Sequence, residues 1–181
     1  MPHVIMVLFL VMMRNYKKVG PNQVLVISGR KLTFIDQATG KTVTRSVRFV
    51  KGGGTIVFPF IERVDELSLE IMTLDVKILK VYTLQGSAVT VDAFAQVKIG
   101  DDEISIMAAA KQLLSKNVEQ IKNVAVQTLE GHLRAILGTL SVGEINKVRD
   151  DIASRVSQAA TADMANIGMT IVSFTIRDVY A

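Results

Sequence analysis

The chain has no cysteine in its 181 residues. This absence excludes disulfides, thiolate nucleophiles, cysteine-based metal sites and S-acylation of this chain. N-myristoylation requires a glycine directly after the initiator methionine, and this chain has Pro2 at that position. Two common routes to fatty acylation are therefore closed.

Residues that carry catalysis are also scarce. Of the two histidines, His3 lies at the terminus and His132 lies in a predicted helix. A helical metal pair needs a second ligand three or four residues away. The positions at that spacing from His132 hold Thr128, Leu129, Ala135 and Ile136. The sequence contains no G-x-S-x-G motif, and the acid pairs at 101–102 and 150–151 are adjacent, so their side chains diverge. We therefore predict no enzyme activity, no metal site and no cofactor.

Positive charge is concentrated near the N-terminus. Residues 14–51 carry nine Lys/Arg and one acid, whereas residues 52–181 carry twelve Lys/Arg and sixteen acids. A pI near 9.4 is compatible with nucleic-acid binding. However, the basic segment lacks interleaved aromatic residues and its charges are spread along predicted strands, so we expect no nucleic-acid partner. The charge adjoins an apolar segment, where it would meet anionic lipid headgroups.

The apolar N-terminal segment is ten residues long, VIMVLFLVMM at 4–13. A membrane-spanning helix needs about twenty residues, and the segment lacks the basic region and cleavage site of a secretory signal. Three interpretations stay open: a membrane-inserted or re-entrant anchor, the trimmed end of a longer spanning helix, or a buried strand. The basic and aromatic residues that follow at 14–18 favour an anchor, with the rest of the chain on the cytoplasmic face. The predicted anchor residues are Val4, Ile5, Met6, Val7, Leu8, Phe9, Leu10, Val11, Met12 and Met13. The predicted headgroup contacts are Arg14, Lys17, Lys18, Arg30 and Lys31.

Residues 14–102 are predicted to form a strand-rich, antiparallel unit. Extended segments are indicated at 23–29, 31–35, 42–50, 56–60, 67–72, 75–82 and 88–99. The glycine cluster at 52–54 precedes Thr-Ile-Val-Phe-Pro, which is strand-forming. A phosphate-binding loop would need a helix at that point, so we interpret the cluster as a turn or bulge.

Residues 103–181 are predicted to be mainly helical, with one closing strand. A short amphipathic helix is indicated at 103–114, with Asp102 as its N-cap. Its predicted inward residues are Ile104, Met107, Ala108 and Leu114. A second helix at 117–140 has an apolar stripe at steps of three and four, and Asn117 with Gln120 resembles a capping box.

A third helix is predicted from 141 to about 164, followed by a strand that alternates over 172–176. Ser141 and Glu144 form an S-x-x-E capping box at the start of this helix. Gly168 can take the left-handed conformation that ends it. The predicted organisation is therefore an anchor at 1–13, a strand-rich half at 14–102 and a helix-helix-strand half at 103–181.

These motifs resemble a known family. The run KNVEQIKNVAVQTLEGHLRAILGTLSVGEI, closed by VSFTIRDVY, is similar to the second half of a flotillin SPFH (band 7) domain. The segments VGPNQVLVISG, GGGTIVFPFIERVDELSLEIMTL and VTVDAFAQVKI are similar to its first half. The resemblance covers about residues 16–180. It implies an α+β domain with a curved antiparallel sheet followed by amphipathic helices and a closing strand.

The resemblance also implies function. Members of the family attach to membranes through the N-terminus and self-assemble into scaffolds that organise membrane microdomains. Animal flotillins attach through acylated residues, whereas an apolar N-terminal segment resembles the prokaryotic-type members. The family continues into a coiled coil, and this chain shows no such heptads before Ala181.

We therefore expect a membrane-anchored, self-assembling scaffold whose partners are lipids, other copies of itself and membrane-protein clients. An alternative is a monomeric or small-oligomer regulatory binding module for a membrane client such as a protease or transporter. A third possibility is a soluble binding domain whose apolar run is a core strand.

Overall fold

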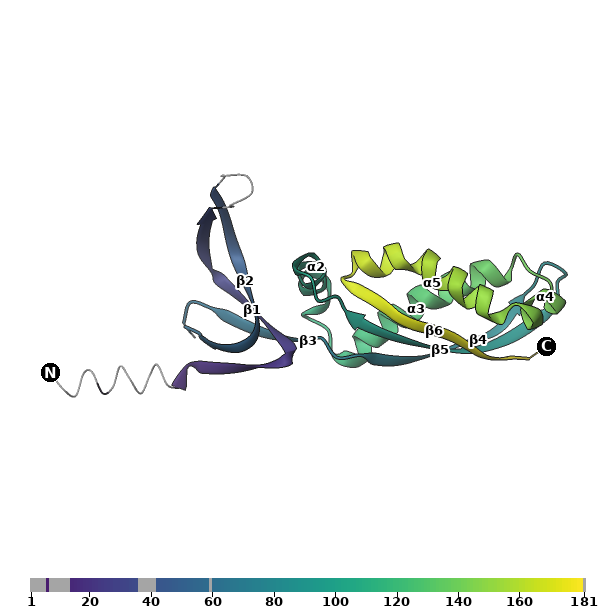
Figure 1. The fold of residues 1–181 in the computed structure, drawn as a ribbon, viewed down its shortest axis with the longest axis horizontal. Coiled ribbons are helices and arrows are strands. Elements are labelled where there is room, and N and C mark those ends of the chain that lie inside the picture. Colours follow the sequence, from purple (N-terminus) through teal and green to yellow (C-terminus); the bar gives the residue numbers. More distant parts are fainter. Residues whose placement is uncertain (1–5, 7–13, 36–41, 59, 181) are drawn as a thin grey trace. The chain divides into compact units, whose positions relative to one another are not determined.

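The computed structural model describes residues 6, 14–35, 42–58 and 60–180, and for residues 30–35 and 42–46 it describes the main chain alone. The chain divides into two compact units, Met1–Leu69 and Glu70–Ala181 (Figure 1). The predicted α+β class is confirmed, with antiparallel strands in both units and helices in the second. The chain changes from strands to helices near residue 102. The compact units nevertheless divide after Leu69, because the strands just before residue 102 pair with the closing strand.

The first unit is a three-stranded antiparallel sheet. It contains β1 (Tyr16–Ile35), β2 (Thr42–Ile56) and β3 (Arg63–Ser68) in the order β2-β1-β3. The central strand β1 is buried on both faces in its middle, where Val24 and Leu25 are at most 2% exposed. A small core of Val19, Leu25, Ile27 and Val57 lies on one face.

Strand β1 is continuous where the sequence predicted two segments, and its pairing with β2 is irregular at two points. At the first, Val19 pairs with Gly53 whereas Val24 pairs with Lys51. Gly52 and Gly53 have φ angles of 67° and 84°, which side chains disfavour. The glycine cluster is thus part of β2 at a bulge, and it lets the sheet curve.

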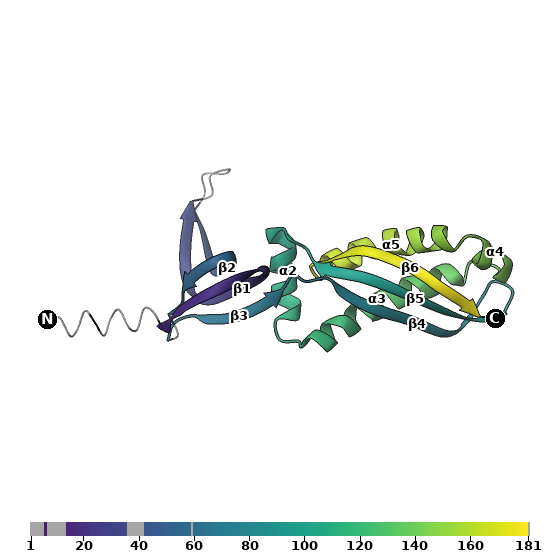
Figure 2. The same cartoon turned by 60° about the horizontal axis from the view of Figure 1, so that its bottom comes forward.

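The second unit is a three-stranded antiparallel sheet with helices on one face. Strands β4 (Met72–Tyr82), β5 (Ala88–Ile99) and β6 (Met169–Tyr180) lie in the order β4-β5-β6. Helix α3 (Val118–Leu137) packs on β4 and helix α5 (Arg149–Asn166) packs on β6 (Figure 2). Alternate residues of β5 from Val89 to Ile99 are buried at 0–1% exposure, as half-buried strands require.

The two long helices follow the sequence patterns closely. The capping box of Asn117 and Gln120 is present in α3, and its buried stripe is Ile121, Ala125, Leu129, Leu133 and Leu137. The capping box of Ser141 and Glu144 is also present, at the start of the short helix α4 (Val142–Lys147). The predicted third helix is interrupted at Val148, which has a φ angle of −122° and a ψ angle of 39°. Val148 is the N-cap of α5, so the segment forms two helices instead of one.

The predicted inward face of the first helix is wrong. Helix α2 (Glu103–Leu113) is capped by Asp102 as predicted, yet its buried residues are Ile106, Ala109, Ala110 and Leu113. Ile104 is 83% exposed. The helix is rotated because Gly168, at the turn before β6, packs directly against the main chain of Ser105 and Ala109. No helix within the described part of the chain is long and apolar enough to cross a membrane.

Candidate functional site

Among the described residues of the first unit, the turn that joins β2 to β3 exposes the most apolar side chain. Phe60 is fully exposed at 100%, Ile61 is 64% exposed and Phe58 is 49% exposed. The main-chain N–H groups of Ile61 and Glu62 both donate to the carbonyl oxygen of Phe58, at 3.0 and 2.8 Å. We call residues 58–61 the apolar turn; its Pro59 lies outside the described residues. The sequence predicted an extended segment to residue 60, but β2 ends at Ile56 because the turn closes on Phe58.

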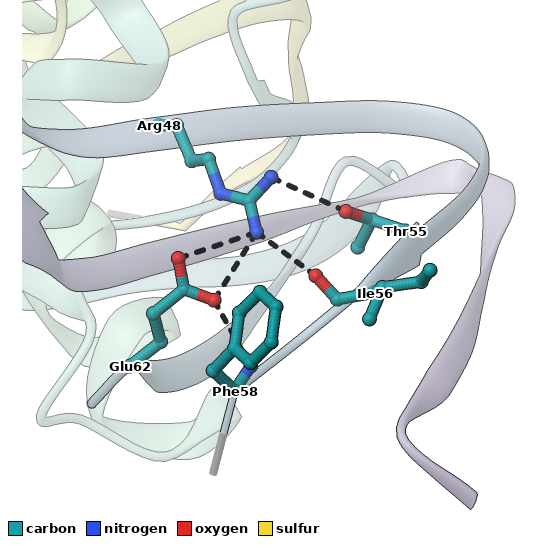
Figure 3. A network of polar contacts seen from close by, with 5 residues as sticks. All are labelled: Arg48, Thr55, Ile56, Phe58 and Glu62. Carbon is teal, nitrogen blue, oxygen red and sulfur yellow. Dashed lines mark hydrogen bonds and ion pairs between the residues drawn. The ribbon is translucent and has the colours of Figure 1, made fainter. Parts of the chain in front are cut away.

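A partly buried ion pair supports the apolar turn (Figure 3). The side chain of Glu62 is 3% exposed, and its Oε2 accepts from Nη2 of Arg48 at 3.2 Å. The same oxygen accepts from the main-chain N–H of Phe58 at 3.1 Å. Nη2 of Arg48 also donates to the carbonyl oxygen of Ile56 at 3.1 Å, and Nη1 donates to Oγ1 of Thr55 at 3.4 Å. A buried charge is costly unless it is hydrogen-bonded, so this network holds the turn in one conformation.

Gly29 supports the turn from the neighbouring strand. Its φ angle is 121°, and a Cβ built on it would collide with the carbonyl oxygen of Ile61. Only glycine accommodates both the conformation and the close approach.

The apolar turn lies beside the point where the described chain starts. The main-chain N–H of Val57 donates to the carbonyl oxygen of Asn15 at 3.1 Å, and Tyr16 pairs with Ile56. The predicted anchor is covalently joined to this point through Arg14. Apart from Met6, which is 57% exposed, the anchor residues lie outside those that the structure describes.

The described part of the predicted headgroup set lies at the same end of the unit. Arg14, Lys17 and Lys18 are exposed, and Lys17 lies 3.9 Å from the carboxylate of Glu66. The side chains of Arg30 and Lys31 lie outside the described residues. The turn, Tyr16 and these three cations thus form one end of the first unit.

Three of the candidate catalytic residues, His132, Asp101 and Asp102, have structural partners. Nε2 of His132 lies 2.8 Å from Oδ2 of Asp163 and links α3 to α5. Oδ2 of Asp102 accepts from the main-chain N–H of Ser105 at 2.9 Å, and hydrogen bonds from Ser105 lower the pKa of Asp102. Oδ2 of Asp101 pairs with Nζ of Lys98 at 2.6 Å. Within the described ranges, no three His, Cys, Asp or Glu residues are grouped to hold a metal.

Residues 17–181 match the model of the SPFH domain / Band 7 family. The chain belongs to this family. Over 168 residues the chain is 44% identical to Flotillin-2 of Homo sapiens, and the matched region covers 93% of this chain and 37% of that protein. It is 38% identical over 176 residues to Flotillin-like protein FloT of Bacillus subtilis (strain 168), which covers 95% of this chain and 34% of that protein.

Flotillin-1 of Drosophila melanogaster is 39% identical over 160 residues, with 88% of this chain and 35% of that protein covered. This SPFH domain therefore spans about a third of the length of the relatives it matches. The flotillin resemblance predicted from the sequence is confirmed.

The sequence did not single out the apolar turn or its support. The segment Phe-Pro-Phe-Ile-Glu at 58–62 nevertheless contains a signal for the turn, because a proline among apolar residues indicates a turn rather than a strand. The partnership of Arg48 with Glu62 left no such signal, because it joins residues fourteen positions apart through the path of β2.

Proposed function

We propose that this SPFH domain is part of a membrane-anchored scaffold and that it meets the membrane with the end of the first unit that carries the apolar turn. One observation carries this proposal. The hydrogen bond from Val57 to Asn15 brings the turn against the start of the described chain, where the apolar segment 4–13 is joined. The apolar turn thus lies beside the point at which the chain continues into the apolar segment.

The energetics favour joint use of these two stretches. Full burial of a Phe or Ile side chain contributes roughly 1.5–3 kcal/mol, so a three-residue turn alone gives reversible binding. Each of Arg14, Lys17 and Lys18 adds about 1 kcal/mol where it approaches anionic headgroups. Stable anchoring generally takes two signals, and the turn supplies a second signal beside the predicted anchor. Arg30 and Lys31 stay proposed headgroup contacts.

The finer parts of the proposal follow from the family. We propose that copies of the protein self-assemble on the cytoplasmic face and gather lipids and client proteins into microdomains. The basic residues after segment 4–13 support the cytoplasmic orientation.

Vesicle flotation tests the membrane contact. The full chain is mixed with vesicles of phosphatidylcholine and phosphatidylglycerol, and the bound fraction is compared for wild type, Phe60→Asp and Leu84→Asp. Leu84 is the matched control, because it is 70% exposed in a turn of the second unit. We expect Phe60→Asp to weaken binding at least tenfold and Leu84→Asp to leave it unchanged. Equal binding by all three chains would contradict the proposed contact surface.

A second measurement addresses the anchor. Membranes carrying the chain with and without residues 1–13 are washed in alkaline carbonate. Retention of the full chain and loss of the shortened one would support an integral anchor. If the full chain also washes off, the segment is not an integral anchor.

Particle size after mild detergent extraction separates the scaffold from the alternative function, a regulatory binding module for one membrane client. A scaffold is expected as large assemblies of this chain. A binding module is expected as a small complex with its client.

A further inference from the structure

The helices of the second unit cover more width than its sheet provides. Packed helices lie about 8–10 Å apart and strands about 4.8 Å apart, so two helices match about four strands. Helices α3 and α5 pack against each other and on a sheet of three strands. The two helices are therefore wider than the sheet, and α5 is the helix that packs on its β6 edge.

A groove lies between α5 and β6. It has a volume of about 450 Å³ and is lined by Asp150, Ala153, Ser154, Ser157 and Gln158 of α5 and by Phe174 and Thr175 of β6. The side chains from α5 are small or polar, and Phe174 is the buried residue of the strand at this place, at 9% exposure. A fourth strand paired with β6 would place its helix-facing side chains in this groove.

The edge of β6 beside the groove is suited to pairing. Residues 169–176, MTIVSFTI, contain no charge and no proline, the features that usually protect an exposed edge. Residues 173–176 pair regularly with β5, between irregularities at Val172 and Arg177. The free edge ends at Arg177, whose carbonyl oxygen accepts from Nη1 of Arg149 at 3.0 Å.

The opposite edge of the sheet is protected. Strand β4 carries Lys77 and Lys80, and its register with β5 shifts between Ile78 and Val81. Lys80 has a φ angle of 54° within this bulge. Bulges occur on both edge strands, so the two edges differ in charge: β4 carries lysines, which oppose pairing at an edge, and residues 169–176 of β6 carry no charge.

We propose that the edge of β6 binds an extended segment of a partner polypeptide as a fourth strand, with a Lys or Arg of that segment directed to Asp150. Main-chain hydrogen bonds to residues 173–176 would supply affinity, and the groove would receive alternate side chains. The carboxylate of Asp150 lines one end of the groove, and none of the ion pairs between described residues includes it. A cation is therefore the complementary group at that end.

The geometry disfavours a second copy pairing through the same edge. Two copies joined at β6 would have six strands, about 29 Å wide, under four helices that need about 32–40 Å. The helices would therefore need about 3–11 Å more width than the joined sheet offers, which would crowd the two α5 helices. A segment without a covering helix of its own meets no such obstacle. The inference goes beyond the proposed membrane function and does not depend on it.

A displayed library of random eight-residue peptides provides the test. Peptides are selected on the full chain in mild detergent, and each enriched peptide is measured against Ser154→Trp and Ala162→Trp. Ser154 lines the groove, and Ala162 is an exposed residue of α5 that does not. We expect binding to fall at least tenfold with Ser154→Trp and to stay unchanged with Ala162→Trp.

Two further measurements locate the peptide. Amide hydrogen exchange of residues 172–176 should slow when an enriched peptide binds. Selection on Asp150→Lys should move the enriched charge at one peptide position from Lys/Arg to Asp/Glu. Failure to enrich any peptide that depends on Ser154, or protection at another surface, overturns the proposal.

A change in sedimentation of the peptide-free chain caused by Ser154→Trp would identify a second copy as the occupant, and it would overturn the assignment to a partner segment. Vesicle flotation of the same variants should match wild type. These two measurements distinguish a variant that has lost membrane binding from one that has lost peptide binding.

Discussion

Gly168 lies against Ala109 so closely that no side chain fits between the turn before β6 and helix α2. A Cβ on Gly168 would lie 2.5 Å from the main-chain nitrogen of Ala109, and the φ angle of Gly168 is 79°. The carbonyl oxygen of Gly168 also accepts from the N–H of Gly100 at 3.0 Å. This contact joins the two ends of the helical segment to the sheet.

We predict that Gly168→Ala destabilises the second unit. The left-handed conformation costs a non-glycine residue about 1–2 kcal/mol, and overpacking adds about 1–3 kcal/mol. The free energy of unfolding, measured by urea titration, should fall by at least about 2 kcal/mol. Gly143→Ala is the matched control, because nothing lies within 4 Å of its Cβ position and alanine favours helix. A loss of similar size in both variants would contradict the packing argument.

Local patterns predicted the parts of the fold that local interactions determine. The capping boxes at Asn117 and Ser141 and the stripe of α3 involve residues three or four apart, and the sequence shows both partners. The orientation of α2 depends instead on Gly168, about sixty residues further along the chain. Its own sequence offered Ile104 as an inward residue, and tertiary packing overrode that choice.

The candidate site was predicted only where the chain is continuous. The basic residues at 14–18 follow the apolar segment directly, so the sequence alone shows that they are its neighbours. The apolar turn reaches the same place only because β2 returns antiparallel to β1 and brings Val57 to Asn15. The glycine cluster at 52–54 indicated a turn or bulge, but it did not indicate which residues of β1 and β2 pair on either side of it.

We predict that removing one partner of the ion pair between Arg48 and Glu62 lowers the free energy of unfolding more than replacing both partners with apolar residues. Glu62→Ala leaves the guanidinium of Arg48, whose Nε already has no hydrogen-bond partner, without its main acceptor. Because the Arg48 side chain is 30% exposed, water relieves part of this cost, and we expect a loss of about 1–3 kcal/mol in the free energy of unfolding. The double variant Arg48→Met, Glu62→Leu should recover part of that loss. A double variant less stable than Glu62→Ala would contradict this prediction.

The cap at Asp102 should make the stability of α2 sensitive to acid. Hydrogen bonds from Ser105 hold the pKa of Asp102 below its ordinary value of 3.8. The unfolded chain therefore takes up this proton at a higher pH than the folded chain does. The stabilisation is fully present above about pH 3.8 and is lost as the pH falls through the lowered pKa.

Melting temperatures of wild type and Asp102→Asn between pH 7 and pH 2.5 check this prediction. Asparagine keeps the capping geometry but does not titrate, so the difference between the two chains should narrow only at the acid end of the range. A constant difference throughout would contradict the linkage. The pKa of Glu144 is likewise lowered by hydrogen bonds from Ser141, and Glu144→Gln should behave in the same way.

The last prediction separates the position of the apolar turn from its composition. Gly29→Ala changes no residue of the turn, but the added Cβ would collide with the carbonyl oxygen of Ile61, so the turn must move. Gly53→Ala is the control, because Gly53 lies in the same unit with a φ angle of 84° and has nothing within 4 Å of its Cβ position. Both variants carry the cost of a left-handed alanine, and both should unfold at lower urea concentration than wild type. Vesicle flotation should nevertheless weaken for Gly29→Ala alone, because the membrane contact depends on where Phe58, Phe60 and Ile61 are held. If the two variants bind vesicles equally well, the turn does not need to be held in place to meet the membrane, and its support by Gly29 serves stability only.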